Sequence, residues 1–188
     1  MRKFFLILFF LTITLIGNAQ EHLSFKGIPI EGSLSSFCQK LKAKGFTQID
    51  KDNNVTVFKG YFTERKAVIA VGATDYGKNV HSVAVMVEES SQWKSLEDTY
   101  DYFKSLYTRK YGHPVKSREQ NPSPSDDNYL LMHELKEGKV NYESLWSVPG
   151  GNIELSIMKW EYLKGIVRIL YRDSLNAEIK IQKELEDI

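Results

Sequence analysis

The chain has 188 residues, of which 42% are hydrophobic, and its 25 basic side chains nearly balance its 24 acidic ones. This length suits one ordinary domain or two small units that share a core. The charge balance gives no electrostatic reason to expect nucleic acid or an anionic membrane surface as a partner. The only cysteine is Cys38, which excludes a disulfide framework.

The start of the chain has the pattern of a secretory signal peptide. Arg2 and Lys3 precede the apolar run Phe4–Ile16, and Ala19 closes a stretch of small residues that fits a cleavage site. The apolar run is shorter than the roughly 20 residues that a membrane-spanning helix needs. We therefore expect residues 1–19 to be removed and the mature protein to be periplasmic or secreted, without stable membrane insertion. A retained N-terminal anchor is the alternative.

Residues 20–90 are predicted to form a first unit, with one helix followed by antiparallel strands. After an extended lead-in, Ser33 can cap a helix that ends at Gly45. Cys38 lies on the apolar face of this helix, which favours a core role over a reactive thiol. The apolar spacing then changes from helical to alternating, and short turns between the runs imply antiparallel pairing. The predicted strands are 55–62, 66–74 and 80–88.

Residues 91–188 are predicted to repeat this order as a second unit. An aromatic stripe that steps by three or four residues predicts a helix over 91–111, which ends at Gly112. An inserted Pro-rich loop and a short helix at 127–137 come next, followed by predicted strands at 140–148, 153–160 and 164–172. The sequence therefore predicts an α+β fold with two tandem helix-plus-antiparallel-strand units, whose helices pack on one face of the sheet.

Three stretches of the mature chain resemble a group of small, uncharacterised exported proteins of Bacteroides-type bacteria. They are Phe25–Ser33 with Phe37, Leu41, Gly45 and Phe46, then Trp93–Glu97 leading into Lys110–Pro114, and then Gly151–Ile157. At the level of the fold, the tandem units resemble the β-lactamase-inhibitor-protein architecture, which small outer-membrane assembly lipoproteins share. The resemblance implies a fold and a compartment and no catalytic residue. The chain also lacks the lipid-bearing cysteine of those lipoproteins.

Searches for known catalytic and metal-binding patterns find none that is complete. His133 and Glu134 begin like the H-E-x-x-H zinc motif, but no second histidine follows one turn later. Residues 50–61 begin like a calcium loop but lack the glycine and the glutamate that it needs. No nucleophile elbow, phosphate loop or dinucleotide fingerprint is present in the sequence. We therefore expect neither a metal nor a cofactor.

Three functions remain as candidates. Tyr142, Trp146 and Trp160 would form a contact surface for an envelope or secreted protein if they share an exposed face, because such rings often anchor interfaces. We therefore expect a non-enzymatic binding or interaction module of the cell envelope. The enzymatic alternative is a hydrolase in which Glu143 and Glu154, on neighbouring strands, act as paired carboxylates. The third is a small-molecule carrier with an apolar cavity between the helices and the sheet.

Overall fold

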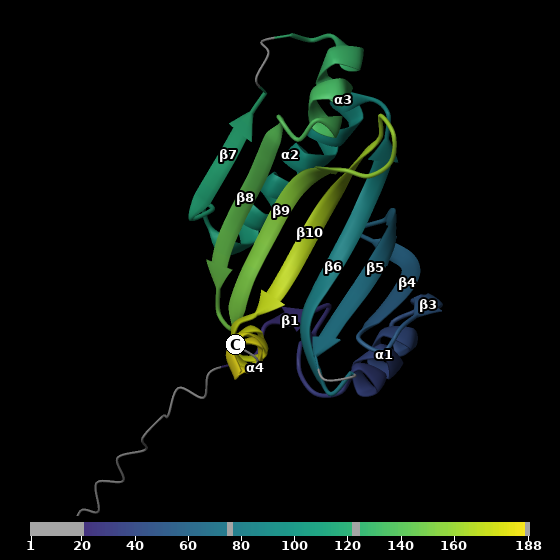
Figure 1. Ribbon diagram of the computed structural model, residues 1–188, viewed down its shortest axis with the longest axis vertical. Helices are drawn as coiled ribbons and strands as arrows, with labels where there is room; N and C mark the ends of the chain where they lie inside the picture. Colours follow the sequence, from purple (N-terminus) through teal and green to yellow (C-terminus); the bar gives the residue numbers. More distant parts are fainter. Residues whose placement is uncertain (1–20, 75–76, 122–124, 187–188) are drawn as a thin grey trace, which may run out of the picture.

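The computed structural model describes residues 21–74, 77–121 and 125–186 (Figure 1). Within these ranges the fold is α+β, as expected, with four helices and an eight-stranded antiparallel sheet. The expected signal peptide, residues 1–19, and part of the inserted loop lie outside the described residues. None of the helices in these ranges combines the length and the hydropathy that a membrane crossing requires.

The elements follow the predicted order, and a short N-terminal hairpin, the edge strands 47–51 and 116–120 and a C-terminal helix complete the fold. The first group is β1 (Ser24–Phe25), β2 (Ile28–Pro29), α1 (Leu34–Ala43), β3 (Thr47–Lys51), β4 (Val55–Phe62), β5 (Arg65–Thr74) and β6 (Asn79–Ser90). The second group is α2 (Trp93–Tyr111), β7 (Lys116–Gln120), α3 (Asn128–Lys136), β8 (Asn141–Val148), β9 (Gly151–Lys159), β10 (Gly165–Asp173) and α4 (Ser174–Glu186).

Two four-stranded meanders join edge to edge to form the sheet. The strand order is β3-β4-β5-β6-β10-β9-β8-β7, so the last strand of each meander lies at the centre. There Val85 of β6 pairs with Ile169 of β10 in an antiparallel register. The outermost strands, β3 and β7, carry mostly exposed and polar side chains, which is a common protection for open edges.

One hydrophobic core lies between the sheet and helices α1 and α2. Alternate strand residues are buried, as their period of two predicts, and the same row across the sheet holds Val85, Ile169 and Leu155. Cys38 of α1 is buried in this core, and burial raises the pKa of its thiol. The hydroxyl of Tyr100 on α2 lies 2.7 Å from the hydroxyl of Ser144 on β8, which fixes the helix against the second meander.

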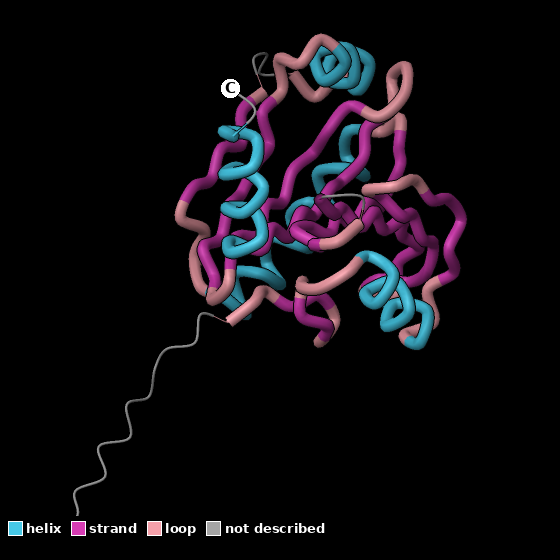
Figure 2. The backbone as a smooth tube through the Cα atoms, turned by 60° about the horizontal axis from the view of Figure 1, so that its bottom comes forward, coloured by secondary structure: helices cyan, strands magenta, loops and turns pink. Residues whose placement is uncertain are grey.

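Helix α4 departs from the arrangement of the other helices. It begins directly after β10, contacts β6, β9 and β10, and runs away from the side on which α1 and the N-terminal hairpin lie (Figure 2). The α+β class and the antiparallel sheet are therefore confirmed. The narrower expectation, that two tandem units place their helices on one face, is not confirmed.

Candidate ligand-binding cleft

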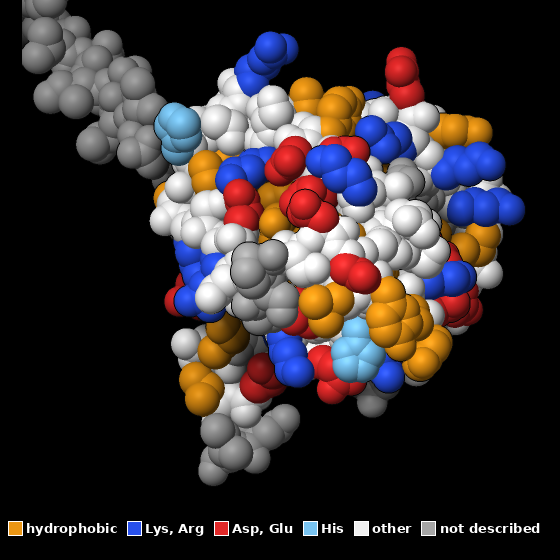
Figure 3. All heavy atoms as spheres, turned by 90° about the horizontal axis from the view of Figure 1, so that it is seen from above, with side chains coloured by type: hydrophobic (Ala, Val, Ile, Leu, Met, Phe, Trp, Pro, Cys, Tyr) orange, Lys and Arg blue, Asp and Glu red, His pale blue; other side chains and the backbone are white. Residues whose placement is uncertain are grey.

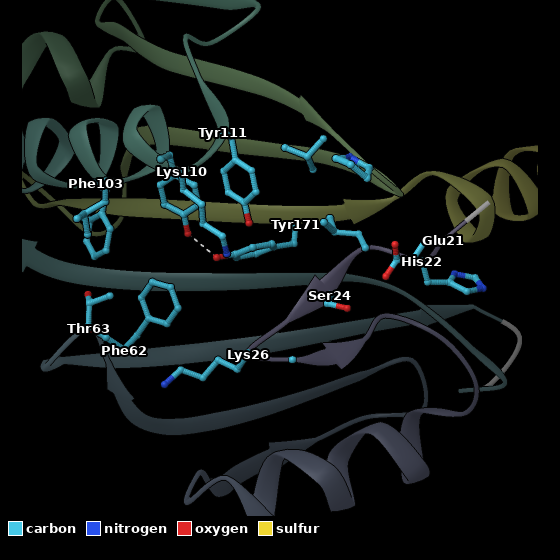
Figure 4. Close-up of a pocket in the computed structure, with 16 residues that line it drawn as sticks. Glu21, His22, Ser24, Lys26, Phe62, Thr63, Phe103, Lys110, Tyr111 and Tyr171 are labelled. Carbon is cyan, nitrogen blue, oxygen red and sulfur yellow. Dashed lines mark hydrogen bonds between the residues drawn. The ribbon is translucent and has the colours of Figure 1, made fainter. Parts of the chain in front are cut away.

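A cavity of about 690 Å³ opens between α2, the N-terminal hairpin and the end of β10 (Figure 4). The turn between β1 and β2 forms one side, the β4–β5 turn forms the end near Phe62, and the last two turns of α2 form the opposite side. Val148 at the end of β8 and Pro149 after it complete the lining. The volume lies within the 300–1,000 Å³ that is usual for small-molecule sites. We call this cavity the cleft.

Aromatic rings form the walls of the cleft. Phe62 stacks on Phe103 of α2 with 5.9 Å between ring centroids, and Tyr107 stacks on Tyr111 with 6.0 Å between centroids. Beneath them, the fully buried Phe25 contacts Tyr171 edge to face at 5.2 Å. These ring contacts join β1, β4, α2 and β10, so the walls of the cleft are an outward continuation of the core.

A buried carboxylate holds the N-terminal segment in place along the cleft. Asp173 is fully buried and accepts hydrogen bonds from the backbone N–H of Leu23 at 2.8 Å and of Asn176 at 2.9 Å. Its Oδ2 also lies 3.1 Å from Nδ1 of His22. Opposite, Gly150 has φ +82°, and a Cβ there would collide with the backbone of residues 21–23. A glycine and a buried acid therefore determine where this wall of the cleft lies.

Two tight turns at the cleft place non-glycine residues in the left-handed region. Lys26 has φ 51° in the β1–β2 turn, where Gly27 follows with φ 75°. Thr63 and Glu64 have φ 47° and 65° in the β4–β5 turn. Such turns favour Asn-Gly, and a β-branched residue with positive φ is a genuine outlier. Backbone strain of this kind is found disproportionately at functional sites, which directs attention to the cleft.

The hydroxyl groups deep in the cleft satisfy one another. Tyr107 and Tyr171 form a hydrogen bond between their phenol oxygens, drawn as a dashed line in Figure 4. Burial raises the pKa of both phenols well above the ordinary value of 10.0, so both remain protonated at neutral pH. Nδ1 of His22 lies against Asp173 and its Nε2 lies 3.7 Å from Glu31. No described hydrogen bond joins this imidazole to Ser24, so these groups do not form a nucleophile–base pair.

Charged groups are segregated along the cleft. Lys26 and Lys110 lie beside the aromatic rings, whereas Glu21 and His22 lie toward the other end of the view (Figure 4). Nζ of Lys26 lies 5.8 Å from the centre of the Phe62 ring, and Nζ of Lys110 lies 4.8 Å from the centre of the Tyr111 ring. Among the described residues, neither ammonium forms an ion pair with a carboxylate. The aromatic end of the cleft is therefore cationic.

The three rings expected to form one exposed surface do not do so. Trp146 is only 1% exposed, packs on Tyr107 and donates from Nε1 to the carbonyl of Gly112 at 3.0 Å. Tyr142 is half-buried against Trp93 and Tyr100, and its hydroxyl donates to Glu97 at 3.2 Å. The expectation is corrected because β8 turns both rings toward α2. Trp160, just after β9, is 48% exposed and remains available for contact.

Glu143 lies on β8 and Glu154 on the neighbouring strand β9, as expected, but each carboxylate forms an ion pair with basic side chains. Arg168 and Arg172 both form ion pairs with Glu154, and Lys116 lies 3.0 Å from Glu143. Neither carboxylate lines the cleft. Within the described ranges, no group of three or more His, Cys, Asp or Glu side chains is placed to hold a metal ion. The arrangement around the two glutamates is that of ion pairs on a sheet surface.

A second, more open hollow of about 890 Å³ lies beside Trp160. Its lining includes Tyr61, which is 63% exposed, together with Val68 and Met86 of the central strands. At the end of the molecule seen from above, acidic and basic side chains are interspersed with hydrophobic ones (Figure 3). No single sign of charge dominates that face, which agrees with the balanced composition.

Sequence reasoning found the helical wall of the cleft but missed its other walls. The stripe that predicts α2 already contains Tyr107 and Tyr111. Alternation in β10 puts Tyr171 on the same buried face as Ile169, so the sequence pattern alone predicts that this ring lies on the core side. Nothing local indicates that Lys26 lines the same cleft as α2, because that arrangement depends on how the N-terminal hairpin docks.

No protein-family model matches this chain, and no curated protein or solved structure matches it either. The resemblance to small exported proteins therefore stays a prediction. The proposed function therefore rests on the geometry of the cleft.

Proposed function

We propose that the protein is an exported, non-enzymatic binding module of the cell envelope, with the cleft as its ligand site. The observation that carries this proposal is a cavity of about 690 Å³ with aromatic walls and polar groups at its rim. Sites for small molecules are typically concave and mostly apolar, with few polar groups that fix orientation. The proposal adopts the small-molecule carrier, the third hypothesis from the sequence, but with the cavity between α2 and the N-terminal hairpin instead of between the helices and the sheet.

The polar groups of the cleft favour binding over catalysis. The protonated phenols of Tyr107 and Tyr171 are paired with each other, and no described hydrogen bond joins His22 to a nucleophile. A general base needs a free lone pair within reach of the proton that it removes. The hydrolase alternative with Glu143 and Glu154 has less support, because both carboxylates are neutralised by neighbouring cations.

The same proposal includes a periplasmic or secreted location and two tandem units, residues 20–90 and 91–188. The order of the sheet supports the tandem units, because each meander follows a helix and ends in a central strand. The cleft would then lie at the seam, where the N-terminal hairpin of one unit meets α2 and β10 of the other. Sites between domains or units are common places for ligands.

Recovery of a bound ligand from the periplasm tests the proposal. The full chain would be expressed with its own N-terminal segment, purified without detergent and analysed by native mass spectrometry. We expect an adduct of a few hundred daltons, a rough size based on the cavity volume. Leu106→Trp would fill the cleft from α2, whereas Leu130→Trp on α3 lies outside it and serves as the matched control.

The adduct should be absent from Leu106→Trp and present in Leu130→Trp. An adduct that persists in Leu106→Trp would show that the cleft does not hold it. The cleft is not a ligand site if the wild-type protein carries no adduct and if every apolar probe that it binds is bound equally well by the Leu106→Trp variant.

A second candidate is contact with a protein partner through the hollow that Trp160 and Tyr61 flank. The observation in its favour is the exposure of both rings beside Val68 and Met86. Its test is capture of a partner from an envelope extract, compared between the wild type and Trp160→Ala/Tyr61→Ala. Equal recovery of the same partner by both proteins would count against it.

A further inference from the structure

We infer that the cleft takes an amphipathic anion, a molecule with an apolar or aromatic body and one anionic group held at the end of the cleft that Lys26 and Lys110 line. This inference rests on the proposed function, because it names the class of ligand for the same site. Four observations carry it: the aromatic walls, two unpaired ammonium groups at their end of the cleft, the position of Glu21 and the strain at Lys26.

Lys26 occupies a turn position at which its own backbone is unfavourable. Both central residues of the β1–β2 turn have positive φ, and asparagine is the preferred residue where Lys26 stands. The side chain reaches between two rings, with Nζ 5.5 Å from the centre of Phe46 and 5.8 Å from the centre of Phe62. These ring contacts leave the ammonium without a carboxylate partner among the described residues, so its charge is available to an anion in the cleft.

Lys110 lines the same cleft as Lys26, from the last turn of α2 (Figure 4). Several other lysines of the second half form ion pairs, as in the contacts of Lys104 with Glu119 and of Lys164 with Glu89. Lys110 lies instead over the ring of Tyr111. Among the described residues it has no carboxylate partner, so its charge is available to a ligand.

The charge distribution also orients the ligand. Glu21 lies toward the far end of the cleft from the two lysines, and two further carboxylates, the buried Asp173 and Glu31, lie against His22 near that end. An anionic group would be repelled at the Glu21 end and attracted at the lysine end. The apolar body would then lie along Phe62, Phe103 and Tyr107, with its anionic group near the exposed ammonium groups beside these rings.

Two fluorescent probes with the same aromatic body test this inference. 1-Anilinonaphthalene-8-sulfonate is anionic, and N-phenyl-1-naphthylamine lacks the sulfonate and is neutral. We expect the wild type to bind the anionic probe about tenfold more tightly than the neutral one, as one charge-assisted contact predicts. We also expect this preference to weaken in high salt, because both lysines are exposed to solvent.

The variant Lys26→Asn/Lys110→Met should bind both probes equally, with the affinity for the neutral probe unchanged. Lys26→Asn suits the turn, so this variant should fold at least as well as the wild type. Lys40→Met/Lys139→Met removes the same charge at exposed positions outside the cleft and should keep the preference. Circular dichroism would verify the fold of each variant.

The outcomes separate this inference from the proposed function. If Leu106→Trp abolishes binding of both probes but the wild type shows no preference for the anion, the cleft binds ligands and the inferred class is wrong. An anion preference that survives Lys26→Asn/Lys110→Met would also overturn the inference. If Leu106→Trp leaves the binding of both probes unchanged, the proposed function itself fails.

Discussion

At the scale of single residues, the β4–β5 turn is a place where the native sequence is not optimal for stability. Thr63 and Glu64 both have positive φ between the paired residues Phe62 and Arg65. We predict that Thr63→Asn/Glu64→Gly raises the free energy of unfolding by about 1–2 kcal/mol, because it removes left-handed strain from two residues. Urea denaturation measures the change, and an unchanged midpoint would contradict the strain argument.

Two tryptophans provide a matched pair that distinguishes core from surface. Trp146 is 1% exposed and hydrogen-bonded to Gly112, whereas Trp160 is 48% exposed. We predict that Trp146→Ala lowers the free energy of unfolding by about 3–5 kcal/mol, through the cavity that it creates. Trp160→Ala should change it by less than about 0.5 kcal/mol, as surface substitutions usually do. Similar losses in both variants would show that Trp160 is also structural.

The burial of Trp146 can be predicted from the sequence, because the residues on either side of it in β8 show which face of the strand is polar. In β8 the residues that alternate with this face are Glu143, Leu145 and Ser147, two of them polar, which points Tyr142 and Trp146 to the core side. The expected contact surface rests on the interface preference of tryptophan, which this alternation contradicts. Period-two patterning is a property of backbone geometry, so it decides the face more reliably than the residue type does.

At the scale of elements, periodicity predicted most helices and strands, whereas tertiary contacts decided several of their ends. The predicted helix 91–111 is observed as Trp93–Tyr111 and ends at Gly112 as expected. Its start is capped by Asn128 Oδ1, which accepts from Trp93 N–H at 2.7 Å across 35 positions of sequence. No local pattern contains that cap. By contrast, Ser33 caps α1 as predicted because its partner, Ser36, is three residues away.

The seam between α2 and β10 should make the protein sensitive to alkaline pH. Tyr107 and Tyr171 are each less than a tenth exposed, and burial raises the pKa of both above 10.0. The unfolded chain ionises these phenols first, so stability is complete below pH 10 and is lost as pH rises above it. We predict a loss of roughly 1 kcal/mol per tyrosine for each pH unit above 10.

Denaturation at a series of pH values measures this loss. The control is Tyr107→Phe/Tyr171→Phe, which removes both hydroxyls of the hydrogen-bonded pair together and leaves neither partner unsatisfied. Its unfolding free energy should fall less steeply above pH 10 than that of the wild type. Equal slopes in the two proteins would show that other groups control the alkaline transition.

At the scale of the whole molecule, the two halves of the chain share their interior. β6 and β10 pair along the centre of the sheet, and one continuous core includes residues of both meanders. The N-terminal segment also packs across the boundary, where Phe25 meets Tyr171 and Asn176 donates to the carbonyls of Ile30 and Val80. Neither half can therefore be removed without exposing the apolar face of the other.

This shared interior predicts a single cooperative unfolding transition, even though the sequence is organised as two successive groups of elements. The chain offers a direct test, because Trp93, Trp146 and Trp160 all lie in residues 91–188 and none lies before them. Tryptophan fluorescence thus reports on the second half alone, while far-ultraviolet circular dichroism reports on both halves. We expect the two signals to give coincident urea transitions, the standard sign of two-state behaviour. A dichroism transition that begins before the fluorescence changes would mean that residues 20–90 unfold independently, and the cleft, which needs Lys26 and Phe62 from that half, would lose its ligand in the same first step.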